Sequence, residues 1–312
     1  MARILVLGGA HIDRRATIDG ATAHGASNPG RWREEPGGGG FNAARSLARL
    51  GHDVAMVSVR GGDRAGEAVG AAMENAGVKD MAQVFLDRAT PSYTAILEND
   101  GNLLVAVADM DLYDHFVYRQ LSRKSIREAI AGADLILCDA NLPADTIGAL
   151  AKITDLNDKP LAAIAISPPK VERLSQAFAS LSALFMNAAE AAVLCGETAR
   201  PDQWPRKLRE RGIARAAISR GEGPVLGFDG TDIFQIMPPR LDNVVDVTGA
   251  GDTLAAATIH ATLNGNGFRT ALRHGVAAAS LAVQSADAAP PELSIATVEA
   301  ALKRVPQAEP FP

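Results

Sequence analysis

From residue 123 onward the sequence alternates amphipathic stretches with short apolar runs, and this rhythm constrains the fold more than any other feature. The amphipathic stretches predict helices over 122–133, 144–155 and 170–179, and the apolar runs predict strands over 134–139, 161–167, 182–187 and 214–220. Short strands that are apolar throughout are buried on both faces, and strands separated by helices pair in parallel. We therefore expect an α/β protein whose mostly parallel sheet is covered by helices on both faces.

The beginning of the chain continues the same pattern. Residues 4–7 are typical of a buried strand, and a helix is predicted after Gly40, where Phe41, Ala44 and Leu47 fall on one apolar face. Length allows one large α/β domain with a small appendage, or two modest domains. We expect one domain over residues 1–305 and a flexible, Pro-rich tail at 306–312.

A different pattern, typical of β-hairpins, interrupts the strand and helix alternation. The runs 93–97 and 103–107 flank Asn-Asp-Gly-Asn at 99–102, a strong turn signal. Together with the polar, Gly-rich segment 14–36, this hairpin predicts a small β lid over about 14–36 and 90–110. Exposed hairpin edges invite pairing with a second copy, so we expect a homodimer through the lid.

Charge and composition exclude several classes of partner. The chain has 31 Lys and Arg against 36 Asp and Glu, with no basic block, so a nucleic-acid polymer is not expected to bind. No apolar run approaches the ~18 residues of a membrane span, and the N-terminus lacks the pattern of an export signal. A cytoplasmic location is the expectation that follows. Cys138 and Cys195 lie in apolar runs, which favours buried free thiols over a disulfide.

The sharpest chemical signal is the segment DVTGAGDT, from Asp246 to Thr253. Its glycines open a predicted helix, where unpaired backbone N–H groups bind anions and glycine lets a phosphate approach closely. A carboxylate there would repel an anion unless it had a task, and Asp252 could take a proton from an attacking hydroxyl. The alternative is a Gly-containing turn with an acid that merely favours the helix dipole.

Two N-terminal segments could supply a polar substrate site. Four glycines precede Asn42, whose amide can both donate to and accept from sugar hydroxyls, although Gly-rich helix entries are also common in purely structural roles. Asp13 follows the first strand, where ligands of open α/β sheets bind. His11 beside it could join the site or simply cap the strand. Neither a Walker A loop nor a dinucleotide-binding fingerprint is present.

Two later strand ends carry further candidates. Glu190 follows Asn187 at the entrance of a predicted helix, where its carboxylate could hold Mg²⁺ through water or could be a simple helix N-terminal acid. Ser219, Gly221 and Gly223 follow another strand and suit contact with the phosphates or ribose of a nucleotide. None of the six histidines has metal-ligand spacing.

These motifs, in this order, resemble the ribokinase-like (PfkB) family of carbohydrate and nucleoside kinases. GGGGFNAARSLARLG and DVTGAGDTLAAA are the two signatures, and the resemblance runs from the first strand to about residue 290. It implies a three-layer α/β/α fold with a small β lid, ATP and Mg²⁺ as cofactors, and phosphorylation of a hydroxyl. By position, Asp252 matches the catalytic base, and the anion hole matches Gly249, Ala250 and Gly251.

The resemblance also implies roles for residues elsewhere in the chain. Asn187 and Glu190 match a motif linked to Mg²⁺ and phosphate, and Asp246 and Thr248 lie where some members bind a monovalent cation such as K⁺ through backbone carbonyls. The expected nucleotide-binding residues are Asn187, Ser219, Gly221, Gly223 and Gly251. The expected substrate-binding residues are His11, Asp13, Gly38, Gly39, Phe41, Asn42 and Asn141.

Within the family the chain is most similar to the pseudouridine kinases, through the segments 27–30, 108–114 and 139–143. The acidic segment 108–114 could equally be a solvated hinge of the lid. Phe41 stands where those kinases are expected to have Arg, and His11 where many family members have Asn. The leading hypothesis is phosphorylation of the 5′-hydroxyl of pseudouridine. The alternatives are a kinase for ribose, a ketohexose or another nucleoside, or a nucleotide-binding protein without turnover.

Overall fold

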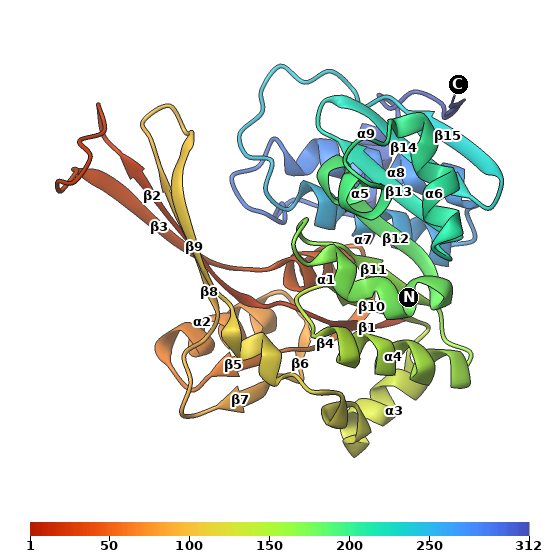
Figure 1. Ribbon diagram of the computed structural model, residues 1–312, viewed down its shortest axis with the longest axis horizontal. Coiled ribbons are helices and arrows are strands. Elements are labelled where there is room, and N and C mark those ends of the chain that lie inside the picture. The colour runs from red at the N-terminus through yellow and green to blue at the C-terminus, as the bar shows by residue number, and fades with distance from the viewer. Residues whose placement is uncertain (312) are drawn as a thin grey trace.

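A ten-stranded sheet forms the centre of the protein, whose structure, a computed structural model, describes residues 1–311 (Figure 1). Neighbouring strands from β6 to β13 pair in parallel, and those from β13 to β16 pair antiparallel. Across the sheet lie β16 (Glu309–Pro310), β15 (Asp232–Ile236), β14 (Gly223–Asp229), β13 (Arg215–Arg220), β12 (Leu181–Asn187), β11 (Leu161–Ile164), β10 (Leu135–Asp139), β1 (Arg3–Leu7), β4 (Asp53–Val57) and β6 (Lys79–Asp80).

Helices cover both faces of this sheet and bury an apolar cluster on each. Leu5 and Leu7 of β1 belong to one cluster, and Ile4 and Val6 belong to the other, so the strand is buried on both sides. The first cluster packs against α3 (Lys124–Gly132), α4 (Ala144–Leu156), α5 (Ala188–Cys195), α6 (Trp204–Glu210) and the 3-10 helices η1 (Asp111–His115), η2 (Tyr118–Ser122) and η3 (Val171–Ser180). The second packs against α1 (Gly39–Arg49), α2 (Arg64–Asn75), α7 (Ala250–Leu263), α8 (Phe268–Ala282) and α9 (Ile295–Leu302). The result is the three-layer α/β/α arrangement that the sequence predicts.

A second sheet projects from the body as an arm (Figure 1). We call it the lid sheet; in order its strands are β3 (Gly30–Gly37), β2 (His11–Ile18), β8 (Ser92–Leu97) and β9 (Leu103–Asp109). It stands where the sequence indicates a small β insertion. Most residues of β9 are exposed. A further short pair joins β5 (Val59–Gly61) to β7 (Gln83–Phe85), and η4 (Pro201–Gln203) precedes α6.

The end of the chain differs from its expected flexible tail. The backbone of β16 pairs with β15, and the Phe311 N–H donates to the Ile233 carbonyl over 3.2 Å. An edge strand offers unpaired N–H and C=O groups, and this segment satisfies them. Phe311 also lies against the guanidinium of Arg220, at 5.9 Å from its ring centroid. The expectation of a flexible 306–312 segment is therefore wrong for residues 309–311; residue 312 lies outside the described part.

The predicted helix over 170–179 is a 3-10 helix, η3, rather than an α-helix. Its buried residues are Val171, Leu174, Ala177 and Phe178, and the first three recur every three positions. That spacing aligns side chains on a helix with three residues per turn.

Cys138 and Cys195 are free and buried, as expected. Among residues 1–311 no helix is long and apolar enough to cross a membrane.

Candidate active site

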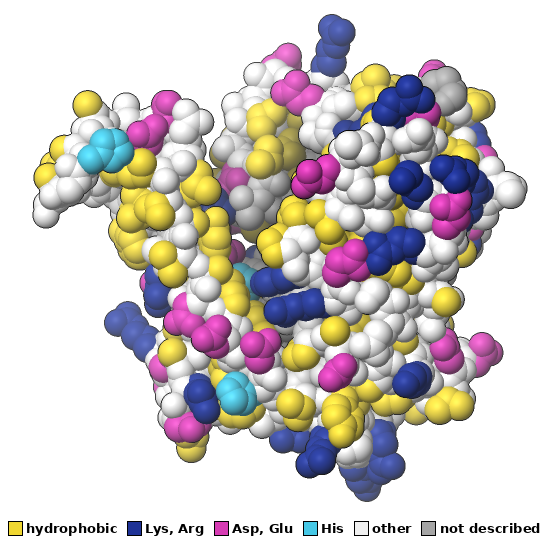
Figure 2. Space-filling view, viewed as in Figure 1, with side chains coloured by type: hydrophobic (Ala, Val, Ile, Leu, Met, Phe, Trp, Pro, Cys, Tyr) yellow, Lys and Arg dark blue, Asp and Glu magenta, His cyan; other side chains and the backbone are white. Residues whose placement is uncertain are grey.

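The first turns of α1 and α7 meet beside the carboxyl ends of the parallel strands. A Cβ placed on Gly39, at the start of α1, would lie 3.2 Å from Asp252 Oδ1, in the first turn of α7. Figure 2 shows a hollow between the lid sheet and the body, with acidic and basic side chains around its lower part. Ligands of open α/β sheets bind at such strand ends.

Asp252 and Asn42 lie where the first turns of α1 and α7 meet, a region that we call the cleft. The Asn42 amide Nδ2 donates a hydrogen bond of 2.9 Å to Asp252 Oδ2. Burial raises the pKa of Asp252 to about 7; the Asn42 hydrogen bond opposes this rise, and the negative charge of Asp139 adds to it. A carboxylate whose pKa lies near neutrality is suited to accept a proton at physiological pH.

The N-terminus of α7, where an anion hole is expected, lies beside this carboxylate. Gly249 caps the helix with φ of 76°, and an added Cβ would lie 1.9 Å from the Ala288 carbonyl oxygen, so only glycine fits. Ala250 and Gly251 follow in the first turn, where backbone N–H groups have no intrahelical partner. Gly251 is exposed, with no atom within 4 Å of the position of its missing Cβ. An anion can therefore approach this turn closely.

Asp139, at the end of β10, ties together the loops that carry the site. Its side chain is fully buried and accepts hydrogen bonds of 2.8 Å from the backbone N–H groups of Gly9, Gly40 and Asn141. These groups belong to the loop after β1, the first turn of α1 and the loop after β10. Sequence reasoning missed this role, although an acid that ends a fully apolar strand is a recognisable signal.

The expected substrate residues His11 and Asn141 lie in polar contacts on the same side of the cleft. His11 Nδ1 lies 2.9 Å from the Tyr113 hydroxyl, and His11 Nε2 lies 3.3 Å from Asp13 Oδ1. The Lys170 ammonium donates a hydrogen bond of 2.7 Å to Asn141 Oδ1. Burial lowers the pKa of Lys170. Tyr113 belongs to the segment 108–114 that carries part of the family resemblance, whereas Lys170 is not indicated by the sequence. The contacts of these two residues with His11 and Asn141 are not predicted, because nothing local links them.

Phe41 is buried in the core, whereas Gly38 lies at the tight entry to α1. The Phe41 side chain is 0% exposed and belongs to the apolar cluster beneath α1, so it offers no surface to a substrate and the expected contact does not fit. The guanidinium of Arg45 covers it, 4.5 Å from the ring centroid. Gly38 has φ of 104°, and a Cβ there would lie 2.6 Å from the Gly9 carbonyl oxygen, which accounts for the need for glycine at this entry to α1.

Arg45 is a further residue of the cleft that the sequence did not indicate. Its Nη2 donates a hydrogen bond of 2.5 Å to Asn42 Oδ1, so Arg45, Asn42 and Asp252 form a continuous chain of contacts. Burial and the nearby Arg49 lower the pKa of Arg45 to about 10, which leaves it charged at neutral pH. Arg45 therefore fixes the Asn42 amide with its nitrogen toward Asp252.

The expected nucleotide residues lie on two neighbouring strand ends. Asn187 ends β12 and Ser219 lies near the end of β13, and the two are direct partners in the parallel register. Gly221 follows in an exposed turn with φ of 60°, and Gly223 begins β14. These positions form a side of the cleft separate from the His11 and Asn141 side.

Glu190 is held by the cap of α5. Its two carboxylate oxygens accept hydrogen bonds from the Asn187 backbone N–H (2.7 Å) and side-chain Nδ2 (3.0 Å), and the residue is 3% exposed. Burial raises the pKa of Glu190, and the contacts with Asn187 oppose the rise. Residues 1–311 contain no cluster of three or more His, Cys, Asp or Glu that could hold a metal. Both Glu190 oxygens are engaged in the capping box of α5, which is the structural role that the sequence left open. Mg²⁺ at this strand end would therefore be held mainly by nucleotide phosphates, with Glu190 in contact only through water.

Asp246 and Thr248 are engaged by a side chain from the lid sheet. Arg15 of β2 forms an ion pair with Asp246, and its Nη2 donates a hydrogen bond of 2.9 Å to Thr248 Oγ1. The Val245 N–H donates to the Val283 carbonyl over 2.8 Å, so this loop also lies against the end of α8. The side chains of Asp246 and Thr248 are thus engaged by Arg15, and the expected role of their backbone carbonyls toward a monovalent cation stays a prediction.

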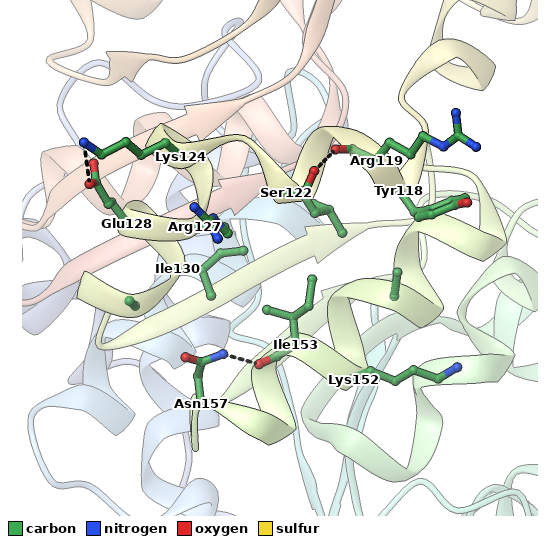
Figure 3. A pocket seen from close by; sticks show the side chains of 13 residues that line it. Tyr118, Arg119, Ser122, Lys124, Arg127, Glu128, Ile130, Lys152, Ile153 and Asn157 are labelled. Atoms are coloured by element: carbon green, nitrogen blue, oxygen red, sulfur yellow. Dashed lines mark hydrogen bonds and ion pairs between the residues drawn. The ribbon is translucent and has the colours of Figure 1, made fainter.

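A separate cavity of about 760 Å³ lies between η2, α3 and α4 (Figure 3). Tyr118, Arg127, Lys152 and Ile153 are among its lining residues, and none of the residues of the catalytic cleft is among them. Lys124 at its rim pairs with Glu128 over 3.8 Å. We therefore place the chemistry in the cleft below the lid sheet.

Known proteins resemble this chain in sequence and in structure. The model of the pfkB family of carbohydrate kinases matches residues 1–295. The pseudouridine kinase of Escherichia coli (strain K12) is 28% identical over 304 residues, which cover 95% of each chain. A solved carbohydrate kinase from Agrobacterium tumefaciens is 53% identical, with a TM-score of 0.89 and full coverage of both chains. Arabidopsis thaliana ribokinase, solved with ribose and ATP, is 23% identical with a TM-score of 0.83 and covers 97% of this chain and 99% of its own.

Proposed function

This chain belongs to the pfkB family of carbohydrate kinases, and within that family we propose that it transfers the γ-phosphoryl group of ATP to the 5′-hydroxyl of pseudouridine. It is a phosphotransferase with an alcohol group as acceptor. The observation that carries the proposed mechanism is the Asn42–Asp252 hydrogen bond beside the open first turn of α7.

The proposed reaction needs a base and a place for the transferring charge. Asp252 accepts the proton of the acceptor hydroxyl as the oxygen forms its bond to phosphorus, and the bond from phosphorus to the departing ADP oxygen breaks. The N–H groups of Ala250 and Gly251 stabilise charge on the phosphoryl oxygens. Mg²⁺, when bound with the nucleotide, neutralises phosphate charge. Asn42 keeps Asp252 oriented throughout.

ATP is assigned to the side formed by β12 and β13. Asn187 and Ser219 lie there as register partners, and Gly221 leaves the turn open. The Arabidopsis ribokinase, a structural neighbour, binds ATP together with ribose. The acceptor is assigned to the side formed by β1 and β10, where Asp13, Asn42 and Asn141 offer polar groups.

A nucleoside acceptor is favoured by the hydrogen-bonding groups beyond the sugar-binding positions. The uracil ring of pseudouridine carries N–H donors and carbonyl acceptors, and the partly exposed Lys170 ammonium can donate to such a carbonyl. Asn141 and Tyr113 are each 1% exposed and act from behind, by holding Lys170 and His11. The similarity to the E. coli pseudouridine kinase supports the same acceptor.

A free sugar is the second candidate, because the Asp13 carboxylate can accept from sugar hydroxyls and the 53% identical protein from Agrobacterium is described only as a carbohydrate kinase. ADP release should be measured with pseudouridine, uridine, ribose and a ketohexose as acceptors. The proposal expects the highest kcat/KM with pseudouridine. Turnover of ribose with inert pseudouridine would replace it by the sugar kinase.

We also propose that the lid sheet forms a homodimer. Leu103, Val105 and Val107 lie on the edge strand β9 and are between 49% and 63% exposed. Trp32 lies on β3, the opposite edge strand of the lid sheet, and is 56% exposed. Light scattering should give twice the 32.5 kDa of one chain, and Val107→Lys should shift the mass toward that of one chain. A wild-type mass of 32.5 kDa would contradict the dimer.

A further inference from the structure

Arg15 links the lid sheet to the loop that precedes the anion-binding turn. It lies in the middle of β2, a strand of the projecting arm in Figure 1. Its guanidinium forms an ion pair with Asp246 and donates a hydrogen bond of 2.9 Å to Thr248 Oγ1. The contact joins residues 231 positions apart, and both charged side chains are 22% exposed.

Asp246 connects Arg15 to the start of α7. Its Oδ1 accepts a hydrogen bond of 2.8 Å from the Thr248 backbone N–H, while its Oδ2 faces Arg15. Thr248 is followed directly by Gly249, the cap of α7 with φ of 76°. The Asp246 carboxylate therefore makes two contacts. It stabilises the turn that precedes the N–H groups of Ala250 and Gly251, and it binds Arg15 of the lid sheet.

The pair is ionised in the pH range where the enzyme would act. Burial alone would raise the pKa of Asp246, but the hydrogen bonds from Thr248 and the contact with Arg15 outweigh it and lower the pKa. Burial opposes the charge of Arg15, and the contact with Asp246 raises its pKa above the ordinary value. Glu35 and Asp13 are the other acids that face this guanidinium.

We propose that Arg15 is a positioning residue that makes the anion-binding turn of α7 depend on the position of the lid sheet. The inference rests on the proposed phosphoryl transfer. Through Asp246 and Thr248, Arg15 holds the N–H groups of Ala250 and Gly251 in place only while β2 lies over the cleft. Transfer to an acceptor enclosed by the lid sheet is thereby favoured over loss of the phosphoryl group to water.

The same strand provides a matched control. Arg14, its neighbour, pairs with Glu34 of β3 over 2.9 Å and thus stays within the lid sheet. Arg14→Gln removes an arginine from β2 without touching the α7 loop. Arg15→Gln removes the link, and Arg15→Lys keeps the charge but not the forked geometry.

Kinetics test the consequence for catalysis. With the best acceptor, Arg15→Gln should lower kcat by about tenfold or more, because small misplacements of catalytic groups have large effects. The KM for ATP should change by less than about threefold, and the share of ATP hydrolysed without transfer should rise. Arg15→Lys should recover part of kcat, and Arg14→Gln should stay within about twofold of wild type. Equal effects of Arg15→Gln and Arg14→Gln on kcat would overturn the proposal.

Hydrogen–deuterium exchange tests the link without any acceptor. The peptide over residues 243–254 should exchange faster in Arg15→Gln than in wild type and in Arg14→Gln, because the turn loses its anchor. Unchanged exchange in Arg15→Gln would overturn the link even if the protein is an active kinase. Faster exchange in a protein that phosphorylates none of the acceptors would keep the link and reject the proposed function.

Discussion

The Asn42 amide nitrogen lies 2.9 Å from Asp252 Oδ2, and this contact joins the first turns of two helices whose residues are 210 positions apart in the sequence. Asn42 can donate only through its nitrogen, and Arg45 fixes that orientation by donating to its oxygen. The proposed base is therefore held by a chain of three side chains, and both its ionisation and its position depend on them.

The activity should depend on the ionisation of Asp252. Because burial raises the pKa of Asp252 to about 7, the carboxyl is mostly protonated at pH 6 and cannot accept a proton. We expect kcat/KM to fall about tenfold for each pH unit below about 6.5, as for a single required base. A pH profile of kcat/KM with saturating ATP measures this. A profile that is flat from pH 5.5 to 8 would contradict it.

Removing the charge of Arg45 should move that profile toward higher pH. Arg45 stabilises the ionised form of Asp252, against Asp139 and Asp13, which disfavour it. In Arg45→Gln we expect activity at pH 6.5 to fall by about threefold more than at pH 8.5, equivalent to half a pKa unit. Glu35, Asp287 and Arg49 also face Arg45, so Arg49→Gln serves as the control and should leave the midpoint in place. An equal fall at all pH values in Arg45→Gln would indicate a role in packing over Phe41 alone.

Gly249→Ala should damage the anion-binding turn. The substitution combines a positive φ of 76° with a Cβ only 1.9 Å from the Ala288 carbonyl oxygen, so the turn must move. We expect kcat to fall by about 10²-fold or more. Gly265, just after the other end of α7, has φ of 86°, and a Cβ added there would have no neighbour within 4 Å. Gly265→Ala should therefore lower stability by about 1 kcal/mol and keep kcat.

Lys170 should separate nucleosides from free sugars. Its ammonium reaches Asn141 and lies at the side of the cleft assigned to the acceptor. If it contacts the base, Lys170→Met should lower kcat/KM for pseudouridine by about tenfold or more, because a hydrogen bond to a charged group is lost, and change that for ribose little. The measurement is the ratio of kcat/KM for pseudouridine to kcat/KM for ribose, determined with one preparation of the variant. Equal losses for both acceptors would place Lys170 in a structural role.

How far the sequence predicts the site depends on how local each feature is. The turn of Gly249 and the acid at Asp252 are contiguous, so their chemistry is evident from DVTGAGDT alone. Asp139 joins three loops through backbone N–H groups, one of them 130 residues away, and Arg15 reaches across 231 residues. A local pattern can mark Asp139 as an unusual acid at the end of an apolar strand, but it cannot show which distant groups Asp139 and Arg15 bind.

Phe41 shows which kind of inference is the safer guide. Helical periodicity places it on the apolar face with Ala44 and Leu47, and all three are buried. Its expected contact with substrate follows from the family resemblance, and the structure places the ring in the core instead. At the end of the chain, the Pro-rich composition predicts a flexible tail, but the structure has the strand β16 there. This strand is favourable because it pairs with the edge of β15, a contact that the local composition does not indicate.

Asp252→Asn tests the central claim most directly, because it keeps the size of the side chain and removes its basicity. Protonation stabilises the folded state of the wild type at low pH, and this contribution is lost as pH rises through the folded-state pKa of about 7, so the neutral amide should not destabilise the protein at pH 7.5. We predict a fall in kcat of ~10²-fold or more with unchanged ATP affinity, measured by calorimetric titration and a phosphoryl-transfer assay. Near-normal turnover in Asp252→Asn would contradict the assignment of this carboxylate as the base.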